Sequence, residues 1–243
     1  MGFRIEMHAH EHLGSPDTEL TAVDYLRELT RLNYKGLLIT NHYDSTIDRF
    51  DGDIIHQNKE WLKSYYSLKE LLEPNGIKIY LGCEYELLPK AFEDEYLQLP
   101  DRRYKISDDT NYCHISLIGD IERLLLSGRL RPGMSLWQLQ QLSNNERFIM
   151  IQNHPTRDTE AHLMSFEAVD GYEWYNAKQT DEYDYNDVLH SISGIPERAL
   201  RVCGSDIHRL DDFGKTACDF DRLPKDIEDL YIQLVERAYT LIY

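Results

Sequence analysis

The sequence predicts an α/β protein folded as a parallel barrel with helices packed outside, and three observations lead to this prediction. Short apolar runs alternate with amphipathic stretches along the chain, as expected when parallel strands are joined by helices. Seven such runs in 243 residues suit a closed or nearly closed barrel made by a single domain, residues 1–243. Histidines or carboxylates stand near the ends of these runs, and parallel barrels carry their chemistry at the carboxyl ends of their strands.

The individual elements follow from the apolar pattern. The predicted strands cover residues 3–10, 36–41, 77–84, 112–118, 147–153, 168–175 and 200–204. The predicted helices cover residues 21–36, 58–76, 121–128, 136–145, 185–193 and 224–243. Pro74 and Gly76 close the second helix, and Pro224 stands near the first turn of the last one.

Composition excludes several classes of protein. No run of about 18 apolar residues exists, so no membrane-spanning segment is predicted. The N-terminus lacks the layout of a signal peptide, and the four cysteines have no CxxC spacing. Reduced thiols and a cytoplasmic location are therefore expected. With 43 acidic and 26 basic residues the net charge is -17, which argues against nucleic acid as a partner.

The strand ends carry an unusual set of side chains. Imidazoles and carboxylates gathered at one mouth of a barrel form a constellation suited to several zinc, iron or manganese ions. Any one of these residues alone is a weak signal, and their coincidence carries the prediction. In chain order they are His8 and His10, His42, Glu84, His114, His154, Glu173 with Asn176, and Asp206 with His208.

The order of these motifs resembles the polymerase-and-histidinol-phosphatase (PHP) family. The resemblance covers Glu6 to His208 and rests on "MHAH", "TNH", the Glu of "GCEYE", the His of "CHISL", "NHP" and "GSDIH". It implies a distorted seven-stranded (βα)7 barrel of the PHP type that holds two or three divalent metal ions and hydrolyses phosphoesters.

The resemblance also implies a role for each ligand. His8, His10, Glu84 and Asp206 would bind one ion, and Glu84 would bridge to a second ion held by His114 and His154. His42 and His208 would hold a third. Glu84, Asp206 and His208 would thus form the catalytic part of the ligand set.

The sequence departs from the family pattern at three places. Glu6 stands where an Asp is usual, and Asn41 replaces the Asp of the TDH element. The family often adds a histidine shortly after the HxH element. Here either His12, which comes early, or Asp17, which lies nearer the usual distance, is a candidate ligand of the third ion.

The chemistry expected of such a site is hydrolysis of a small phosphorylated metabolite. Two ions roughly 3.5–4 Å apart can hold a bridging hydroxide that attacks phosphorus in line. Arg157 and Arg209, close in sequence to His154 and His208, are predicted to bind the other phosphoryl oxygens, and Asn176 is a further candidate for substrate binding.

Other functions remain open at this point. Within the same chemistry they are a histidinol-phosphate phosphatase, a protein-tyrosine phosphatase and, less favoured by the charge, a diesterase or exonuclease. An amidohydrolase-like hydrolase of C–N or C–O bonds shares the HxH at the first strand and the Asp at the last. A non-catalytic scaffold would be expected to have lost ligands, whereas nearly every expected position is filled.

Overall fold

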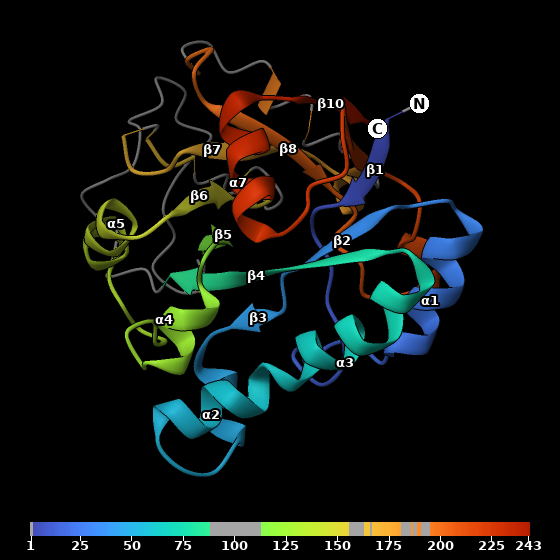
Figure 1. Cartoon of the computed structure of the whole chain (residues 1–243). Coiled ribbons are helices and arrows are strands. Elements are labelled where there is room, and N and C mark those ends of the chain that lie inside the picture. The colour runs from blue at the N-terminus through green and yellow to red at the C-terminus, as the bar shows by residue number, and fades with distance from the viewer. Residues whose placement is uncertain are drawn as a thin grey trace.

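The seven strands predicted from the sequence form one sheet, in the order β1–β2–β4–β5–β6–β7–β8 (Figure 1). The computed structural model describes residues 2–87, 113–155, 163–165, 167–180, 186, 189–190 and 195–243. The seven strands are β1 (Phe3–Glu6), β2 (Gly36–Ile39), β4 (Lys78–Leu87), β5 (Cys113–Gly119), β6 (Phe148–Gln152), β7 (Gly171–Asn176) and β8 (Leu200–Gly204). The short strand β3 (His42–Tyr43) pairs with β4.

Helices cover the outer side of this sheet (Figure 1). They are α1 (Ala22–Arg31), α2 (Ile54–Trp61), α3 (Lys63–Leu72), α4 (Glu122–Leu126) and α5 (Leu136–Asn145), whereas α7 (Ile227–Glu236) lies at one end of the barrel. Short 3-10 turns are η1 (Ser45–Arg49), η2 (Glu73–Asn75), η4 (Ala177–Thr180) and η5 (Leu210–Asp212). The α1 helix begins with a capping box between Thr21 and Asp24, which satisfies its first backbone N–H groups.

Two predicted helices need correction. The predicted helix 58–76 is two helices, α2 and α3, that meet at Leu62, and α2 begins earlier because the Asp53 side chain caps its N-terminus. The predicted helix 224–243 ends at Arg237, whose φ of 58° lies in the left-handed region and turns the chain. The following residues form β10 (Tyr239–Ile242), which pairs with β9 (Ala217–Phe220).

The sheet is mixed and not wholly parallel as predicted. Strand β5 runs antiparallel to both β4 and β6, and β9 runs antiparallel to β1. This reversal is not visible in the sequence, because the apolar pattern of a strand buried on both faces does not encode its direction. The pairs β1–β2, β2–β4, β6–β7 and β7–β8 are parallel, so their carboxyl ends share one edge.

One end of the barrel interior is filled with apolar side chains. Leu230 and Leu234 of α7 are fully buried in the same cluster as Ile5 of β1 and Leu38 of β2. The α7 helix therefore closes that end of the barrel. The opposite end, to which the parallel strands run, is left for polar side chains.

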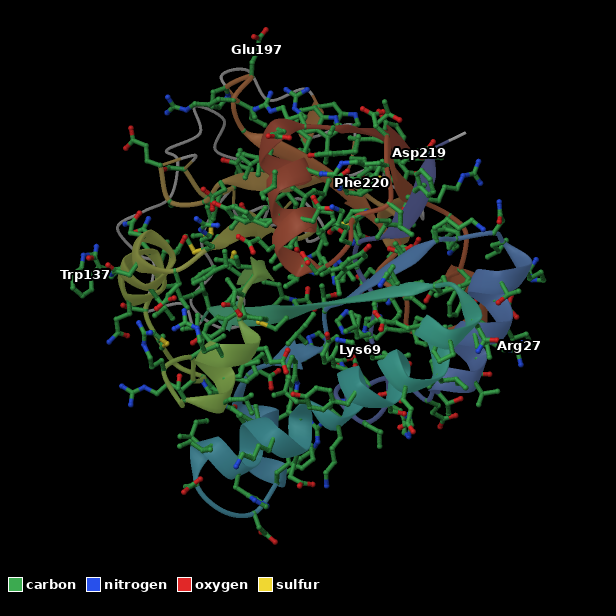
Figure 2. All side chains as sticks on the ribbon, in the orientation of Figure 1. Arg27, Lys69, Trp137, Glu197, Asp219 and Phe220 are labelled. Atoms are coloured by element: carbon green, nitrogen blue, oxygen red, sulfur yellow. The ribbon has the colours of Figure 1, made fainter. Side chains whose placement is uncertain are left out.

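The surface, the cysteines and the helix lengths can be compared with the expectations from composition. Arg27, Trp137 and Glu197 lie at the edge of the molecule in Figure 2, and Trp137 is 62% exposed. Cys83, Cys113, Cys203 and Cys218 are buried free thiols, as expected. Within the described ranges, no helix has the length and apolarity needed to span a bilayer.

Candidate metal centre

The extended chain after β1 and the chain after β8 lie side by side, joined by a bridge between Ala9 and Ile207. The backbone N–H of His10 donates to the Ile207 carbonyl at 3.1 Å, and the Ile207 N–H donates to the His8 carbonyl at 3.2 Å. Because side chains alternate along extended backbone, the residues that flank Ala9 project to one side, and the pairing brings the residues that flank Ile207 beside them. These are four predicted ligands, His8, His10, Asp206 and His208.

Glu6 fixes these two segments to each other. Its Oε1 atom accepts the backbone N–H of His8 at 3.0 Å and that of Ser205, which precedes Asp206, at 2.8 Å. Glu6 is fully buried, and burial raises its pKa to about 7. The departure from the family's usual Asp thus supplies a side chain that joins the ends of β1 and β8.

The carboxylate of Glu84 on β4 is the centre of the cluster. Five histidine nitrogens surround it, and each of its oxygens faces a different subset. Oε1 lies 3.0 Å from His114 Nδ1, 3.2 Å from His154 Nε2 and 3.3 Å from His8 Nε2, while Oε2 lies 3.0 Å from His42 Nδ1 and 3.4 Å from His10 Nε2. A carboxylate placed in this way can bridge two cations.

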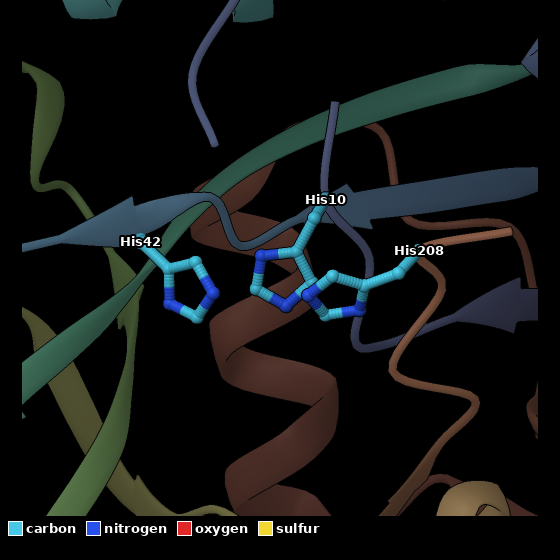
Figure 3. A group of neighbouring side chains, drawn as sticks. All are labelled: His10, His42 and His208. Carbon is cyan, nitrogen blue, oxygen red and sulfur yellow. The ribbon is translucent and has the colours of Figure 1, made fainter. Parts of the chain in front are cut away.

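Two further carboxylates complete the cluster. Asp206 Oδ1 lies 3.4 Å from His10 Nε2 and 3.2 Å from His208 Nδ1. Asp17 Oδ2 lies 2.8 Å from His208 Nε2 and 3.1 Å from His42 Nε2. The rings of His10, His42 and His208 lie together in Figure 3, with the His10 ring centroid 4.4 Å from that of His42 and 4.2 Å from that of His208.

The structure separates the two candidates for the third site. Asp17 joins His42 and His208, as described above, whereas the His12 ring points elsewhere: its Nδ1 lies 2.5 Å from Glu11 Oε1 and 3.2 Å from the Leu20 carbonyl. Of the two, Asp17 is the one that lies beside the predicted ligands of the third ion.

Burial and charge act together on these groups. Burial alone would raise the pKa of Glu84, but the surrounding histidines, His114 first, hold it well below its usual range. Burial lowers the pKa of His42, yet Glu84 and Asp17 raise it to about 10 overall. Asp17 and Asp206 likewise raise the pKa of His208 to about 9 against the effect of burial. In the metal-free protein, protons on His42 and His208 thus offset part of the carboxylate charge.

Unpartnered atoms test whether cations fit this cluster. His8 Nε2, His10 Nε2, His114 Nδ1 and Glu84 Oε2 are buried without a hydrogen-bond partner among the described residues. Three overlapping sets of ligand atoms have the spacing of a metal site: His8–His10–Glu84, His42–Glu84–His114 and His10–His42–His208. Imidazole nitrogen and carboxylate oxygen are donors that suit zinc, iron and manganese. The residues present therefore fit a cluster of divalent ions.

Glu173 on β7 orients two of the predicted ligands by hydrogen bonds, a role that was not predicted from the sequence. Its Oε1 lies 2.9 Å from His8 Nδ1, and because a carboxylate only accepts, His8 donates there and keeps the lone pair on Nε2. Its Oε2 accepts the backbone N–H of His154 at 2.7 Å. His154 and Asp206 have φ values of 27° and 52°, unusual for residues with a side chain and typical of functional sites.

Asn41 has a structural role in place of the family's Asp. Its Oδ1 accepts the backbone N–H of Glu11 at 2.7 Å, and its Nδ2 donates to Ser64 Oγ at 2.8 Å. The side chain thus fixes the loop that carries Asp17.

The residues predicted to bind substrate differ in where they lie. Arg157 lies outside the described residues. Arg209 is exposed and follows His208 directly. Asn176 is fully buried and its Nδ2 donates to Glu173 Oε2 at 2.9 Å, so its contact with substrate stays a prediction. Lys178, which was not predicted, contacts the cluster directly: its Nζ lies 2.5 Å from His208 Nδ1. Its position just after the sixth predicted strand was the signal that could have found it.

Comparison with known proteins supports the fold. No protein-family model and no curated protein sequence matches the chain. PsfC from Pseudomonas syringae matches in structure with a TM-score of 0.61 and 15% identity, over 100% of this chain and 92% of PsfC.

Two further solved structures match. A two-domain protein from Bacteroides vulgatus that contains a predicted PHP-like metal-dependent phosphoesterase gives a TM-score of 0.64 at 14% identity, over 100% of this chain and 65% of that protein. A candidate metal-dependent phosphoesterase from Bifidobacterium adolescentis gives 0.50 at 14% identity, over 96% of both chains. These matches confirm the predicted barrel fold.

Proposed function

The chain has the fold of PHP-like metal-dependent phosphoesterases, and from this premise we propose that it hydrolyses a small phosphate monoester at a cluster of two or three divalent ions. One observation carries the proposal. The carboxylate of Glu84 is buried at the centre of five histidines; two of the three overlapping ligand sets contain it, and the third shares His10 and His42 with those two. A single structural ion would need only one of these sets.

The ligand atoms divide into three sites. His8, His10, Glu84 and Asp206 would hold one ion, His114 and His154 with Glu84 a second, and Asp17, His42 and His208 a third. Zinc, iron or manganese bound there would supply a Lewis acid and a nucleophile derived from water at neutral pH. The position of Glu84 is consistent with a bridging role, since its carboxylate lies within 3.5 Å of histidines assigned to all three sites.

The exposure of the ligands indicates the side from which substrate approaches. The side chains of His8, His10 and Glu84 are at most 2% exposed, whereas those of His114 and Asp17 are 22% and 46% exposed. A phosphoryl group would therefore reach the cluster from the Asp17 and His114 side, with its organic part directed to solvent and to the loops. This arrangement suits a small substrate.

The overall charge also favours a small substrate. At -17 the protein surface repels an extended polyanion, so a nucleic-acid strand would gain nothing from long-range attraction. A single phosphoryl group needs only a local positive centre, which bound ions supply.

Matched chromogenic substrates test the proposal and its alternatives. We expect metal-loaded protein to hydrolyse p-nitrophenyl phosphate much faster than bis(p-nitrophenyl) phosphate, p-nitrophenyl acetate or p-nitroacetanilide. Glu84→Gln should lower the turnover at least about 100-fold, because it removes the bridging carboxylate. The control Glu167→Gln changes an exposed acid and should leave turnover unchanged. Preference for the anilide or the acetate would instead favour the amidohydrolase-like function, and preference for the diester would favour a phosphodiesterase.

A further inference from the structure

We propose that Lys178 binds a phosphoryl oxygen of the substrate, a role that rests on the phosphoesterase function proposed above. Lys178 belongs to η4, directly after the carboxyl end of β7. Its Nζ lies 2.5 Å from His208 Nδ1 and 3.7 Å from Asp206 Oδ1, and its side chain is 26% exposed. Among the described residues it is the lysine or arginine whose charged group reaches the cluster.

Lys178 is not the only group within hydrogen-bond distance of His208 Nδ1. His208 Nδ1 also lies 3.0 Å from the backbone carbonyl of Asp206. A carbonyl only accepts and an ammonium only donates, so Nδ1 can serve one of these two groups at a time. When His208 Nε2 is a metal ligand, the usual arrangement has Nδ1–H donating to a carbonyl or carboxylate. That arrangement releases the ammonium of Lys178 for another acceptor beside the cluster.

A buried polar network fixes the position of Lys178 relative to the ligands. The backbone N–H of Lys178 donates to Asn176 Oδ1 at 2.9 Å, and Asn176 Nδ2 donates to Glu173 Oε2, also at 2.9 Å. Glu173 in turn holds the His8 ring and the His154 backbone. Asn176 is therefore a positioning residue: the same carboxylate that orients two metal ligands also anchors the turn that carries the lysine.

A cation with a free donor suits the chemistry at this place and would add to the charge of the bound ions. A phosphate monoester is a dianion near neutral pH, and the protein carries a net charge of -17. An ammonium on a flexible stem, a quarter exposed beside the open side of the cluster, can bind a phosphoryl oxygen by a charge-assisted hydrogen bond.

Phosphate affinity tests this role apart from turnover. The variants are Lys178→Met, Lys178→Arg, which keeps the charge, and Lys59→Met, which removes an equal charge from an exposed position on the outer helix α2 (Figure 1). Inorganic phosphate is titrated calorimetrically into each metal-loaded protein. Metal content and the KM and kcat for p-nitrophenyl phosphate are measured alongside.

We expect Lys178→Met to weaken phosphate binding by on the order of 10- to 100-fold and to raise KM, with metal content unchanged. Lys178→Arg should retain most of the affinity, and Lys59→Met all of it. Unchanged phosphate affinity in Lys178→Met would overturn the proposal, as would a loss explained entirely by lost metal. Wild-type protein that hydrolyses no phosphoester would overturn the proposed function instead, so the two failures are distinguishable.

Discussion

The substitution Glu173→Gln exchanges one oxygen of the supporting carboxylate for an amide NH2 group. Glu173 Oε2 accepts two donors, the His154 N–H and the Asn176 amide, whereas Oε1 accepts only His8 Nδ1. The single oxygen that remains in the variant keeps more hydrogen bonds if it takes the Oε2 position. The new NH2 group then faces His8 Nδ1, which must become an acceptor and move its proton to Nε2, the atom directed at the metal cluster.

The expected effect is a loss of metal affinity with the fold retained. Loss of a supporting partner to a metal-ligating histidine typically costs about 10- to 100-fold in affinity, or about 1.4–2.8 kcal/mol. Because the volume of the side chain is nearly unchanged, core packing should be kept.

Calorimetric titration of zinc or manganese into chelator-treated protein measures this loss. Glu197→Gln, an exposed position, is the matched control and should bind metal as the wild type does. Circular dichroism checks that each variant is folded. If Glu173→Gln bound the first ion with wild-type affinity, the assignment of the His8 tautomer and the supporting role of Glu173 would be wrong.

Two further predictions concern pH and packing. Because contacts in the folded, metal-free protein raise the pKa of His42 to about 10 and of His208 to about 9, the stability they give is complete below about pH 6.5 and is lost as pH rises through 9 to 10. The melting temperature of chelated protein should fall over this window, and a constant value would contradict the pKa assignment. A Cβ atom at Gly204 would lie 2.3 Å from the His8 Cβ and 2.5 Å from Glu173 Oε1. Gly204→Ala should therefore cost about 1–3 kcal/mol in urea unfolding and weaken metal binding, and unchanged values would contradict the close packing.

Most of the cluster could be predicted from the sequence because strand ends in one sheet share an edge. His8 and His10 with Asp206 and His208 stand beside apolar runs, and backbone pairing between Ala9 and Ile207 brings them together. No detailed knowledge of packing was needed for that inference. It required the alternation of side chains along each strand and the shared edge at which the strands end.

What the sequence could not reveal depends on contacts between distant segments. The strand-end pattern draws attention to Glu173 and to the position of Lys178, but their roles depend on His8 and His208, which lie far from them in the sequence. The direction of β5 leaves no trace in its apolar pattern. The segment of the last strand, β10, was predicted as helix from its local pattern. It forms a strand because its pairing with β9 outweighs that pattern.

Hydrolysis by a cluster of ions is tested by the turnover of p-nitrophenyl phosphate as a function of the number of ions bound per chain. Chelator-treated protein is reloaded stepwise with zinc, iron or manganese, and bound metal is measured by elemental analysis of each sample. We expect no turnover without metal and full turnover at two or three ions per chain. Turnover that does not depend on bound metal, or a fully loaded protein without turnover, would show that the cluster is not a phosphoesterase centre.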